Sequence, residues 1–128
     1  MNACLSFRVL CVDDNRDIAD STAMLLRIFG FEVRACYDGH TALRVAMEFS
    51  PNLCVIDLNM PGMAGDELAV QLRGQPHGRP LWLVAMTAMH EETYRKRTRA
   101  AGFDIHLVKP VDPEKLVALV QQAQARAG

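Results

Sequence analysis

The sequence lacks the features that mark membrane, secreted and nucleic-acid-binding proteins. No apolar run approaches the roughly 20 residues of a membrane-spanning helix. The first residues lack the basic region, apolar stretch and cleavage site of a signal peptide. The formal net charge is −1 at pH 7, so no excess of positive charge exists to attract nucleic acid or a membrane surface. These absences predict a cytoplasmic protein that binds neither nucleic acid nor a membrane.

The cysteines do not form a metal-binding or disulfide pattern. Cys4, Cys11, Cys36 and Cys54 contain no Cys-x-x-Cys pair, which argues against a zinc site and a disulfide framework. Three of them fall within predicted strands, where a thiol behaves as a small hydrophobic group. Cys4 precedes the first predicted strand and is expected to be exposed.

Length and composition predict a single domain. The chain has 128 residues and half of them are apolar, which suits one well-filled core. It contains no linker, internal repeat or low-complexity stretch. We therefore expect one domain over residues 1–128, with its core from about 7 to 125 and no effector domain. The initial Met1 favours a stand-alone chain over part of a longer one.

Apolar, branched runs alternate with segments of helical spacing. The predicted strands are Phe7–Val12, Glu32–Cys36, Leu53–Asp57, Leu81–Ala85 and Asp104–Val108. The predicted helices are Asn15–Phe29, Asp38 to about Phe49, Gly65–Arg73, His90–Ala101 and a last one that Asp112 caps and Pro113 begins. In the first helix the predicted apolar stripe is Ile18, Thr22, Leu25 and Phe29, flanked by Ala19 and Leu26. Strict alternation predicts an α/β fold of three layers, with parallel strands and helices on both faces.

Charged residues follow three of the predicted strands directly. Asp13-Asp14 follow the first, Asp57 ends the third, and Lys109 follows the fifth. The carboxyl ends of strands are where open α/β sheets build their sites. Three carboxylates close together repel one another unless a cation joins them, and Mg²⁺ prefers such oxygen ligands. The lysine adds a point charge suited to a phosphoryl oxygen.

Each of these features alone has an ordinary explanation. An Asp pair after a strand is usually a helix cap, and Asp57 before a Pro-Gly loop resembles a turn starter. Lys109-Pro110 alone is typical of a loop, and Thr87 alone of a helix cap. Their joint placement at one edge of the predicted sheet favours a functional site.

In chain order, these motifs resemble the receiver domains of bacterial two-component signalling. The motifs are Asp13-Asp14, Asp57 before Met60-Pro61-x-Met63-x-Gly65, Thr87 within Met86-Thr87-Ala88, and Lys109-Pro110. The likeness extends from about Phe7 to Ala125. It implies a flavodoxin-like fold, a doubly wound five-stranded parallel sheet in the order 2-1-3-4-5.

The resemblance also assigns roles to the motif residues. Asp57 would be the phosphoacceptor, a carboxylate nucleophile that receives its phosphoryl group from a sensor or hybrid histidine kinase or a histidine phosphotransfer protein. Asp13, Asp14, Asp57 and the main-chain carbonyl of Asn59 would hold Mg²⁺, with Mn²⁺ as a substitute. Lys109 would pair with Asp57 and then with the phosphoryl group.

Further positions of the family map onto the second half of the chain. Thr87 would donate a hydrogen bond to a phosphoryl oxygen, and the bond before Pro110 would be cis. Asn59 and Met89 stand where the family tunes the lifetime of the phosphoryl group. The family's aromatic switch residue is replaced by His106, which is less apolar than Tyr or Phe. His106 is thus either the switch partner of Thr87 or a half-exposed surface histidine. The run 101–113 is similar to receivers that work with hybrid kinases.

The resemblance implies two interaction surfaces. The family docks its kinase on the first helix and the loop after strand five, here Asn15, Ile18, Ala19, Thr22, Pro110 and Val111. Alternatively, Ile18 faces the sheet. The output surface would be helix four, strand five and helix five, for a downstream target protein or a self-dimer. The basic residues of the fourth helix, Arg95, Lys96, Arg97 and Arg99, suit its dipole and indicate a solvated face.

The expected function is therefore phosphoacceptor signalling without turnover of a free substrate. Two alternatives are a degenerate receiver that only binds proteins and a phosphate sink for a hybrid kinase. A hydrolase with an aspartate nucleophile would need a second aspartate two residues further on, where this chain has Asn59.

Overall fold

Strands and helices alternate along the whole chain. The computed structural model describes residues 7–77, 79–88 and 92–127. The elements, in order, are β1 (Arg8–Val12), α1 (Arg16–Ile28), β2 (Glu32–Cys36), α2 (Gly39–Phe49), β3 (Leu53–Asp57), α3 (Gly65–Gly74), β4 (Trp82–Thr87), α4 (Glu92–Ala100), β5 (Ile105–Val108) and α5 (Pro113–Ala127). The predicted elements are confirmed, although β4 continues to Thr87, two residues beyond the predicted end. The predicted start of the fourth helix at His90 lies outside the described residues.

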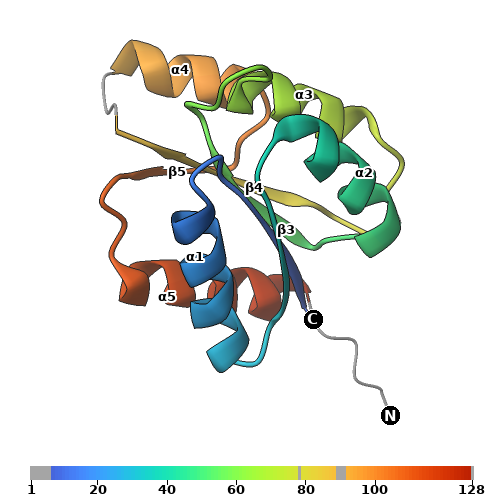
Figure 1. Ribbon diagram of the computed structural model, residues 1–128, viewed down its shortest axis with the longest axis vertical. Helices are drawn as coiled ribbons and strands as arrows, with labels where there is room; N and C mark the ends of the chain where they lie inside the picture. Colours follow the sequence, from blue (N-terminus) through green and yellow to red (C-terminus); the bar gives the residue numbers. More distant parts are fainter. Residues whose placement is uncertain (1–6, 78, 89–91, 128) are drawn as a thin grey trace.

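The strands form one parallel sheet in the order β2-β1-β3-β4-β5. In this register Val12 of β1 lies beside Ile56 of β3, and Asp57 beside Met86 of β4. Helices α1 and α5 cover one face, and α2, α3 and α4 cover the other (Figure 1). The predicted three-layer, flavodoxin-like fold is confirmed, and all five carboxyl ends of the strands meet at one edge of the sheet.

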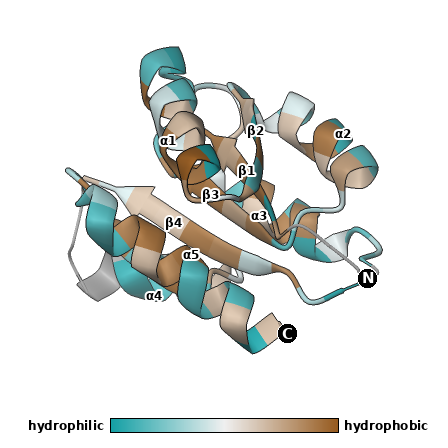
Figure 2. Ribbon diagram, turned by 90° about the horizontal axis from the view of Figure 1, so that it is seen from below, coloured by the Kyte–Doolittle hydropathy of each residue, from teal (hydrophilic) through white to brown (hydrophobic). Residues whose placement is uncertain are grey.

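Two apolar clusters fill the layers on either side of the sheet. Leu10 and Ile56 pack with α2 and α3, whereas Val9 and Val55 pack with α1 and α5. The inner strands β3 and β4 are apolar along most of their length because helices cover both faces, as their colouring in Figure 2 shows. Cys11, Cys36 and Cys54 are buried free thiols, as predicted; Cys4 lies outside the described residues.

Helix α1 is rotated relative to the predicted stripe. Its buried positions are Ala19, Ala23 and Leu26, while Phe29 is 51% exposed and Ile18 is 37% exposed. The predicted helix is confirmed, but Ile18 and Phe29 of its apolar stripe lie at the surface, and the flanking residues Ala19 and Leu26 face the sheet. The sequence has more apolar residues in this helix than the sheet covers, and periodicity alone does not select which of two adjacent stripes is buried.

Side-chain caps begin several of the helices. Asn15 accepts a hydrogen bond from the Ile18 N–H at the start of α1, and Asp38 accepts one from the Thr41 N–H at the start of α2. Asp112 accepts from the Glu114 N–H at the start of α5, as predicted. Such caps satisfy N–H groups that have no partner within the helix.

Arg73, in the last turn of α3, joins the amino ends of β4 and β5. Its guanidinium donates to the carbonyl of Leu81 at 2.6 Å and to that of Gly102 at 2.7 Å, and it pairs with Asp104 at 2.7 Å. Asp104 also accepts from the Leu83 N–H at 2.8 Å. This network lies at the edge of the sheet opposite the acidic residues.

Within the described residues, no helix has the length and apolar character needed to cross a bilayer.

Candidate functional site

An acidic cluster lies at the carboxyl ends of β1 and β3. Asp13 and Asp14 follow β1, Asp57 ends β3, and the two strands are neighbours in the sheet. One carboxylate oxygen from each residue lies within 4.8 Å of the others. Asp13 and Asp57 are buried, whereas Asp14 is exposed. The parallel register brings together residues more than forty positions apart, as the sequence predicted.

Backbone N–H groups hold two of these carboxylates in place. The Asn15 N–H donates to Asp13 Oδ1 at 3.0 Å, and the Asn59 N–H donates to Asp57 Oδ1 at 3.2 Å. The backbone of Asp13 also donates to the carbonyl of Cys36, at the end of β2. The orientation of the acidic side chains is therefore fixed by the loops that leave the strands.

Lys109 brings a positive charge to the cluster. Its Nζ lies 3.1 Å from Asp57 Oδ1 and 3.5 Å from Asp13 Oδ2. Partial burial lowers the pKa of Lys109, but the hydrogen bond to Asp57 and the charges of Asp13 and Asp57 outweigh it, so the pKa is raised. The lysine therefore remains an ammonium group at neutral pH. The peptide bond to Pro110 is cis, as the family resemblance implied.

Asp13 carries the observation that bears on a metal ion. Its Oδ2 is buried and has no hydrogen-bond partner among the described residues, although Lys109 Nζ lies 3.5 Å away. Burial raises the pKa of Asp13; the Asn15 N–H opposes that shift and the charge of Asp57 adds to it. One ammonium group does not balance three carboxylates. A hard divalent cation fits this set of oxygen donors, and Mg²⁺ prefers such ligands.

Gly65 allows the start of α3 to lie against the backbone of β3. Its N–H donates to the carbonyl of Leu58 at 3.2 Å. A Cβ at this position would lie 2.7 Å from the carbonyl oxygen of Asp57 and 2.7 Å from the Cα of Leu58. Because these are backbone atoms, they have little freedom to move away, so the absence of a side chain at Gly65 helps to position Asp57.

Thr87 and His106 occupy adjacent strands but face different surroundings. Thr87 is fully buried at the end of β4, and its carbonyl accepts from the Lys109 N–H at 2.7 Å. His106 is half-buried in β5, where its Nδ1 lies 3.3 Å from the hydroxyl of Thr98 in α4. It does not belong to the acidic cluster. Met89 lies outside the described residues.

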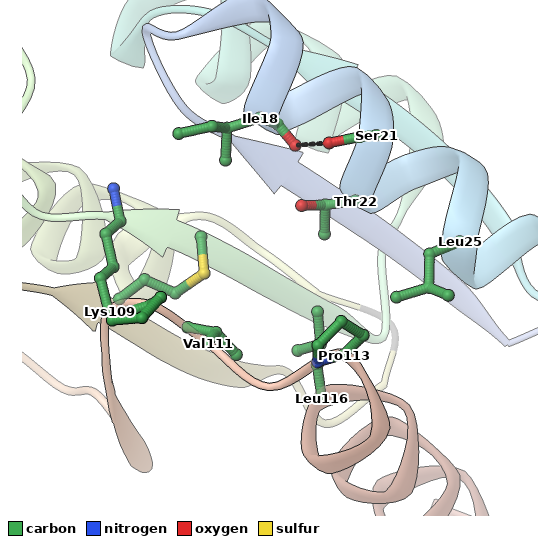
Figure 3. A pocket seen from close by; sticks show the side chains of 10 residues that line it. Ile18, Ser21, Thr22, Leu25, Lys109, Val111, Pro113 and Leu116 are labelled. Carbon is green, nitrogen blue, oxygen red and sulfur yellow. Dashed lines mark hydrogen bonds between the residues drawn. The ribbon is translucent and has the colours of Figure 1, made fainter.

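A mostly apolar groove of about 650 Å³ runs from Lys109 between α1 and the start of α5. Ile18 and Thr22 of α1 and Pro110 line it, and Asn15 caps the same helix one turn earlier. The side chain of Ile18 points into the groove (Figure 3). The alternative in which Ile18 faces the sheet is therefore wrong. Of the residues predicted for docking, Ile18, Thr22, Pro110 and Val111 line the groove, whereas Ala19 is buried.

Several residues of this region were not predicted from the sequence. Leu25, Met86 and Leu116 also line the groove, but the sequence showed them only as apolar residues expected in the core. Tyr37 was missed as well: its hydroxyl donates to Asp20 at 2.6 Å and links the end of β2 to α1. These contacts depend on the rotation of α1 about its axis, for which the sequence gives no unique signal.

Comparison with known proteins agrees with this geometry. Residues 9–121 match the family model of the response regulator receiver domain. The chain belongs to this family. Its receiver fold resembles chemotaxis protein CheY4 of Vibrio cholerae, with a TM-score of 0.86, 29% identity, and coverage of 93% of this chain and 99% of that one. A putative response regulator from Chloroflexus aurantiacus gives a TM-score of 0.85 at 30% identity, covering 95% and 100% of the two chains.

Curated relatives of this receiver include longer regulators. The receiver is 37% identical over 121 residues to the transcriptional regulatory protein PrrA of Mycobacterium tuberculosis, covering 94% of this chain and 51% of PrrA. It is 34% identical over 114 residues to the DNA-binding response regulator MtrA of Mycobacterium leprae, covering 89% and 49%. The chain thus spans about half the length of these two relatives. An uncharacterized 14.6 kDa protein of Leptolyngbya boryana is 38% identical over 114 residues, covering 89% of this chain and 87% of that protein.

Proposed function

We propose that this receiver takes up a phosphoryl group on Asp57 in a Mg²⁺-dependent reaction and thereby changes a protein-interaction surface. The observation that supports the proposal best is the pairing of Asp57 with Lys109 at 3.1 Å beside Asp13 and Asp14. A buried carboxylate nucleophile next to a fixed cation and a candidate metal site suits phosphoryl transfer, in which catalysis is mostly positioning and electrostatics.

The metal ligands of the proposal are Asp13, Asp14, Asp57 and the main-chain carbonyl of Asn59. The buried Oδ2 of Asp13 supports the assignment, because it lacks a hydrogen-bond donor among the described residues. When bound, Mg²⁺ would neutralise the negative charge of the carboxylates and of the incoming phosphoryl oxygens. We propose the same ligands for Mn²⁺.

The proposed transfer proceeds from a phosphohistidine donor. An oxygen of Asp57 forms the new bond to phosphorus as the phosphorus–nitrogen bond breaks, and the imidazole leaves with the electron pair. Lys109 Nζ, which pairs with the carboxylate beforehand, then pairs with a phosphoryl oxygen. The hydroxyl of Thr87 donates a hydrogen bond to another phosphoryl oxygen. Asn59 would tune the lifetime of the phosphoryl group, and no free substrate is turned over. The second position expected to tune it, Met89, lies outside the described residues.

We propose the groove beside Lys109 as the docking site of the phosphoryl donor. Its apolar lining includes Ile18 and Pro110, and its position at the acidic cluster would bring a donor histidine close to Asp57. An apolar groove between two helices suits a partner helix. The donor would be a sensor or hybrid histidine kinase or a histidine phosphotransfer protein in the cytoplasm, and the output surface would be α4, β5 and α5, with Thr87 and His106 as its switch.

Intact-mass spectrometry tests the proposal. The wild-type protein, Asp57→Asn and the control Asp17→Asn, which changes an exposed aspartate of α1, are incubated with acetyl phosphate with and without Mg²⁺. We expect one added phosphoryl group on wild type and control only when Mg²⁺ is present, and none on Asp57→Asn. A label retained by Asp57→Asn would contradict the assignment of the acceptor. Absence of label on all three would favour a receiver that acts only as a binding module.

A further inference from the structure

A second groove, of about 290 Å³, lies between α4 and β5. Its lining residues are Arg95, Thr98, Arg99, Phe103, Asp104, Ile105 and His106. None of these residues belongs to the acidic cluster or to the apolar groove beside α1. We refer to it as the α4–β5 groove.

The charge of the α4–β5 groove is positive. Arg95 and Arg99 lie one helical turn apart on α4, so both guanidinium groups are on the same side of the helix. Both are exposed, and neither forms an ion pair with any residue that the structure describes. Arg97 differs, because it pairs with Asp66 of α3 at 2.6 Å. The part of α4 that is visible in Figure 2 is coloured hydrophilic.

The one carboxylate in the lining is already neutralised. Asp104 pairs with Arg73 at 2.7 Å and accepts the Leu83 N–H at 2.8 Å. Its charge is therefore balanced from the side of α3 and the sheet. The two arginines of α4 leave the groove with positive charge that the described residues do not compensate, although the whole chain has a net charge of −1.

The floor of the groove is polar and hydrogen-bonded. The hydroxyl of buried Thr98 donates to the carbonyl of Arg95 at 2.9 Å. The same hydroxyl lies 3.3 Å from His106 Nδ1. Phe103 and Ile105 add apolar contact area beside this floor.

We propose that the α4–β5 groove binds an acidic segment of a partner protein, with a carboxylate paired to Arg95 and Arg99. Guanidinium groups form paired hydrogen bonds with carboxylates, and Phe103 and Ile105 suit the methylene groups of a glutamate. β5 is the edge strand of the sheet, so an extended segment can also pair with its backbone. The inference rests on the proposed function, because this surface is the one that phosphorylation would change.

A protein segment fits this groove better than a nucleic acid does. Nucleic-acid binding relies on many phosphate contacts over a broad positive surface, whereas the positive charge here is confined to α4 in a chain of net charge −1. The groove also combines its two arginines with the apolar groups of Phe103 and Ile105. Two arginines beside two apolar side chains suit a single acidic side chain with its methylene groups.

Fluorescence anisotropy with a labelled oligoglutamate peptide tests the inference. The proteins are wild type, the double variant Arg95→Gln/Arg99→Gln, and a control, Arg44→Gln/Lys115→Gln, which removes two exposed positive charges from α2 and α5. We expect the groove variant to weaken binding by about tenfold or more, because two charge-assisted contacts are lost. The control should stay within about twofold of wild type, and a labelled oligoglutamine peptide should not bind.

Three results would overturn the inference: no binding of oligoglutamate to wild type, equal weakening in both double variants, or tighter binding of a single-stranded oligonucleotide of matched charge. Phosphoryl uptake from acetyl phosphate is measured on the same samples. Retained uptake in the groove variant shows that it is folded. Uptake on Asp57 without peptide binding would refute the groove alone, whereas groove-specific peptide binding without uptake would refute the proposed function alone.

Discussion

At the scale of single residues, Lys109 controls the charge balance of the acidic site. Its ammonium group is the cation placed between two buried carboxylates, at 3.1 Å from Asp57 and 3.5 Å from Asp13. It therefore has two opposing effects. It stabilises the carboxylates when no metal is bound, and it repels a divalent cation that approaches the same oxygens.

Replacing Lys109 with methionine should separate these two effects. We expect Mg²⁺ affinity to rise by about tenfold, because a positive charge close to the metal ligands is removed. Phosphoryl uptake should slow, because the cation that pairs with the phosphoryl oxygens is lost. Isothermal titration with Mg²⁺ and the time course of uptake from acetyl phosphate measure the two effects. Lys115→Met, an exposed lysine of α5, is the control; weaker Mg²⁺ binding by Lys109→Met would contradict the argument.

At the scale of elements, the contact between β3 and α3 depends on Gly65. We expect Gly65→Ala to destabilise the protein by about 2 kcal/mol or more, because the new methyl group meets backbone atoms that cannot move freely. Phosphoryl uptake should fall with it, since the displaced backbone carries Asp57. Urea unfolding and intact-mass measurements of uptake test this prediction.

Gly74 supplies a matched control at the other end of the same helix. A Cβ at Gly74 would have no heavy atom within 4 Å, and alanine favours a helix over glycine by about 1 kcal/mol. Gly74→Ala should therefore leave stability unchanged or raise it, with normal phosphoryl uptake. Equal losses in the two variants would show that α3 tolerates neither substitution for reasons unrelated to Asp57.

The connection that Arg73 makes between α3, β4 and β5 should be visible in stability. We expect Arg73→Met to cost about 2 kcal/mol, because two carbonyls and the Asp104 carboxylate lose a charged donor. Urea unfolding measures the loss. Arg44→Met on α2, where the side chain is exposed, should change the free energy of unfolding by less than about 0.5 kcal/mol. A similar value for both variants would show that the Arg73 network contributes nothing.

At the scale of the whole molecule, the buried thiols make stability depend on alkaline pH. Burial raises the pKa of Cys11 from 9.0 to about 12 and that of Cys36 from 9.0 to about 11. The folded state therefore keeps protons that the unfolded chain loses above about pH 9. Because the unfolded state then binds fewer protons, the free energy of unfolding falls as pH rises, up to the folded pKa of each thiol.

Each such thiol should lower the stability by about 1.4 kcal/mol per pH unit in that range. Urea unfolding at about pH 8 and about pH 10 measures the loss. The variant Cys36→Ala should be less stable at about pH 8, because a buried side chain is shortened, yet it should lose about 1 kcal/mol less than wild type between the two pH values. An unchanged pH dependence in this variant would contradict the burial of the Cys36 thiol in solution.

The parallel sheet could be predicted from the alternation of strands and helices, whereas the strand order that makes β1 and β3 neighbours was implied by the resemblance to receiver domains. A parallel sheet places the residues that follow its strands at one edge, so Asp13, Asp57 and Lys109 could be brought together without knowledge of packing. Residues whose role depends on the rotation of a helix were not predictable in this way. Leu25 was expected in the core, and it also lines the groove beside α1. Arg95 was expected on a solvated face, and it lines the α4–β5 groove.

Long-range side-chain contacts were the other features that could not be predicted from the sequence. Arg73 was expected only as the end of a helix, yet it reaches the carbonyls of Leu81 and Gly102. Carbonyl groups are present at every residue, so a sequence contains no signal for which of them an arginine will meet. The same reasoning applies to the hydrogen bond of Tyr37 to Asp20.

Arg73 also fixes the C-terminal end of helix α4, so the helix can tilt about that end. The helix ends at Ala100, and Arg73 holds the carbonyl of Gly102 just beyond it. With nine residues α4 is about 13 Å long, so a tilt of about 10° about that end displaces the other end by about 2 Å. The exposed Arg97–Asp66 pair would resist such a swing only weakly. Arg95, further from that end than Arg99, would travel further, so a small tilt would move the two guanidinium groups by different amounts relative to β5.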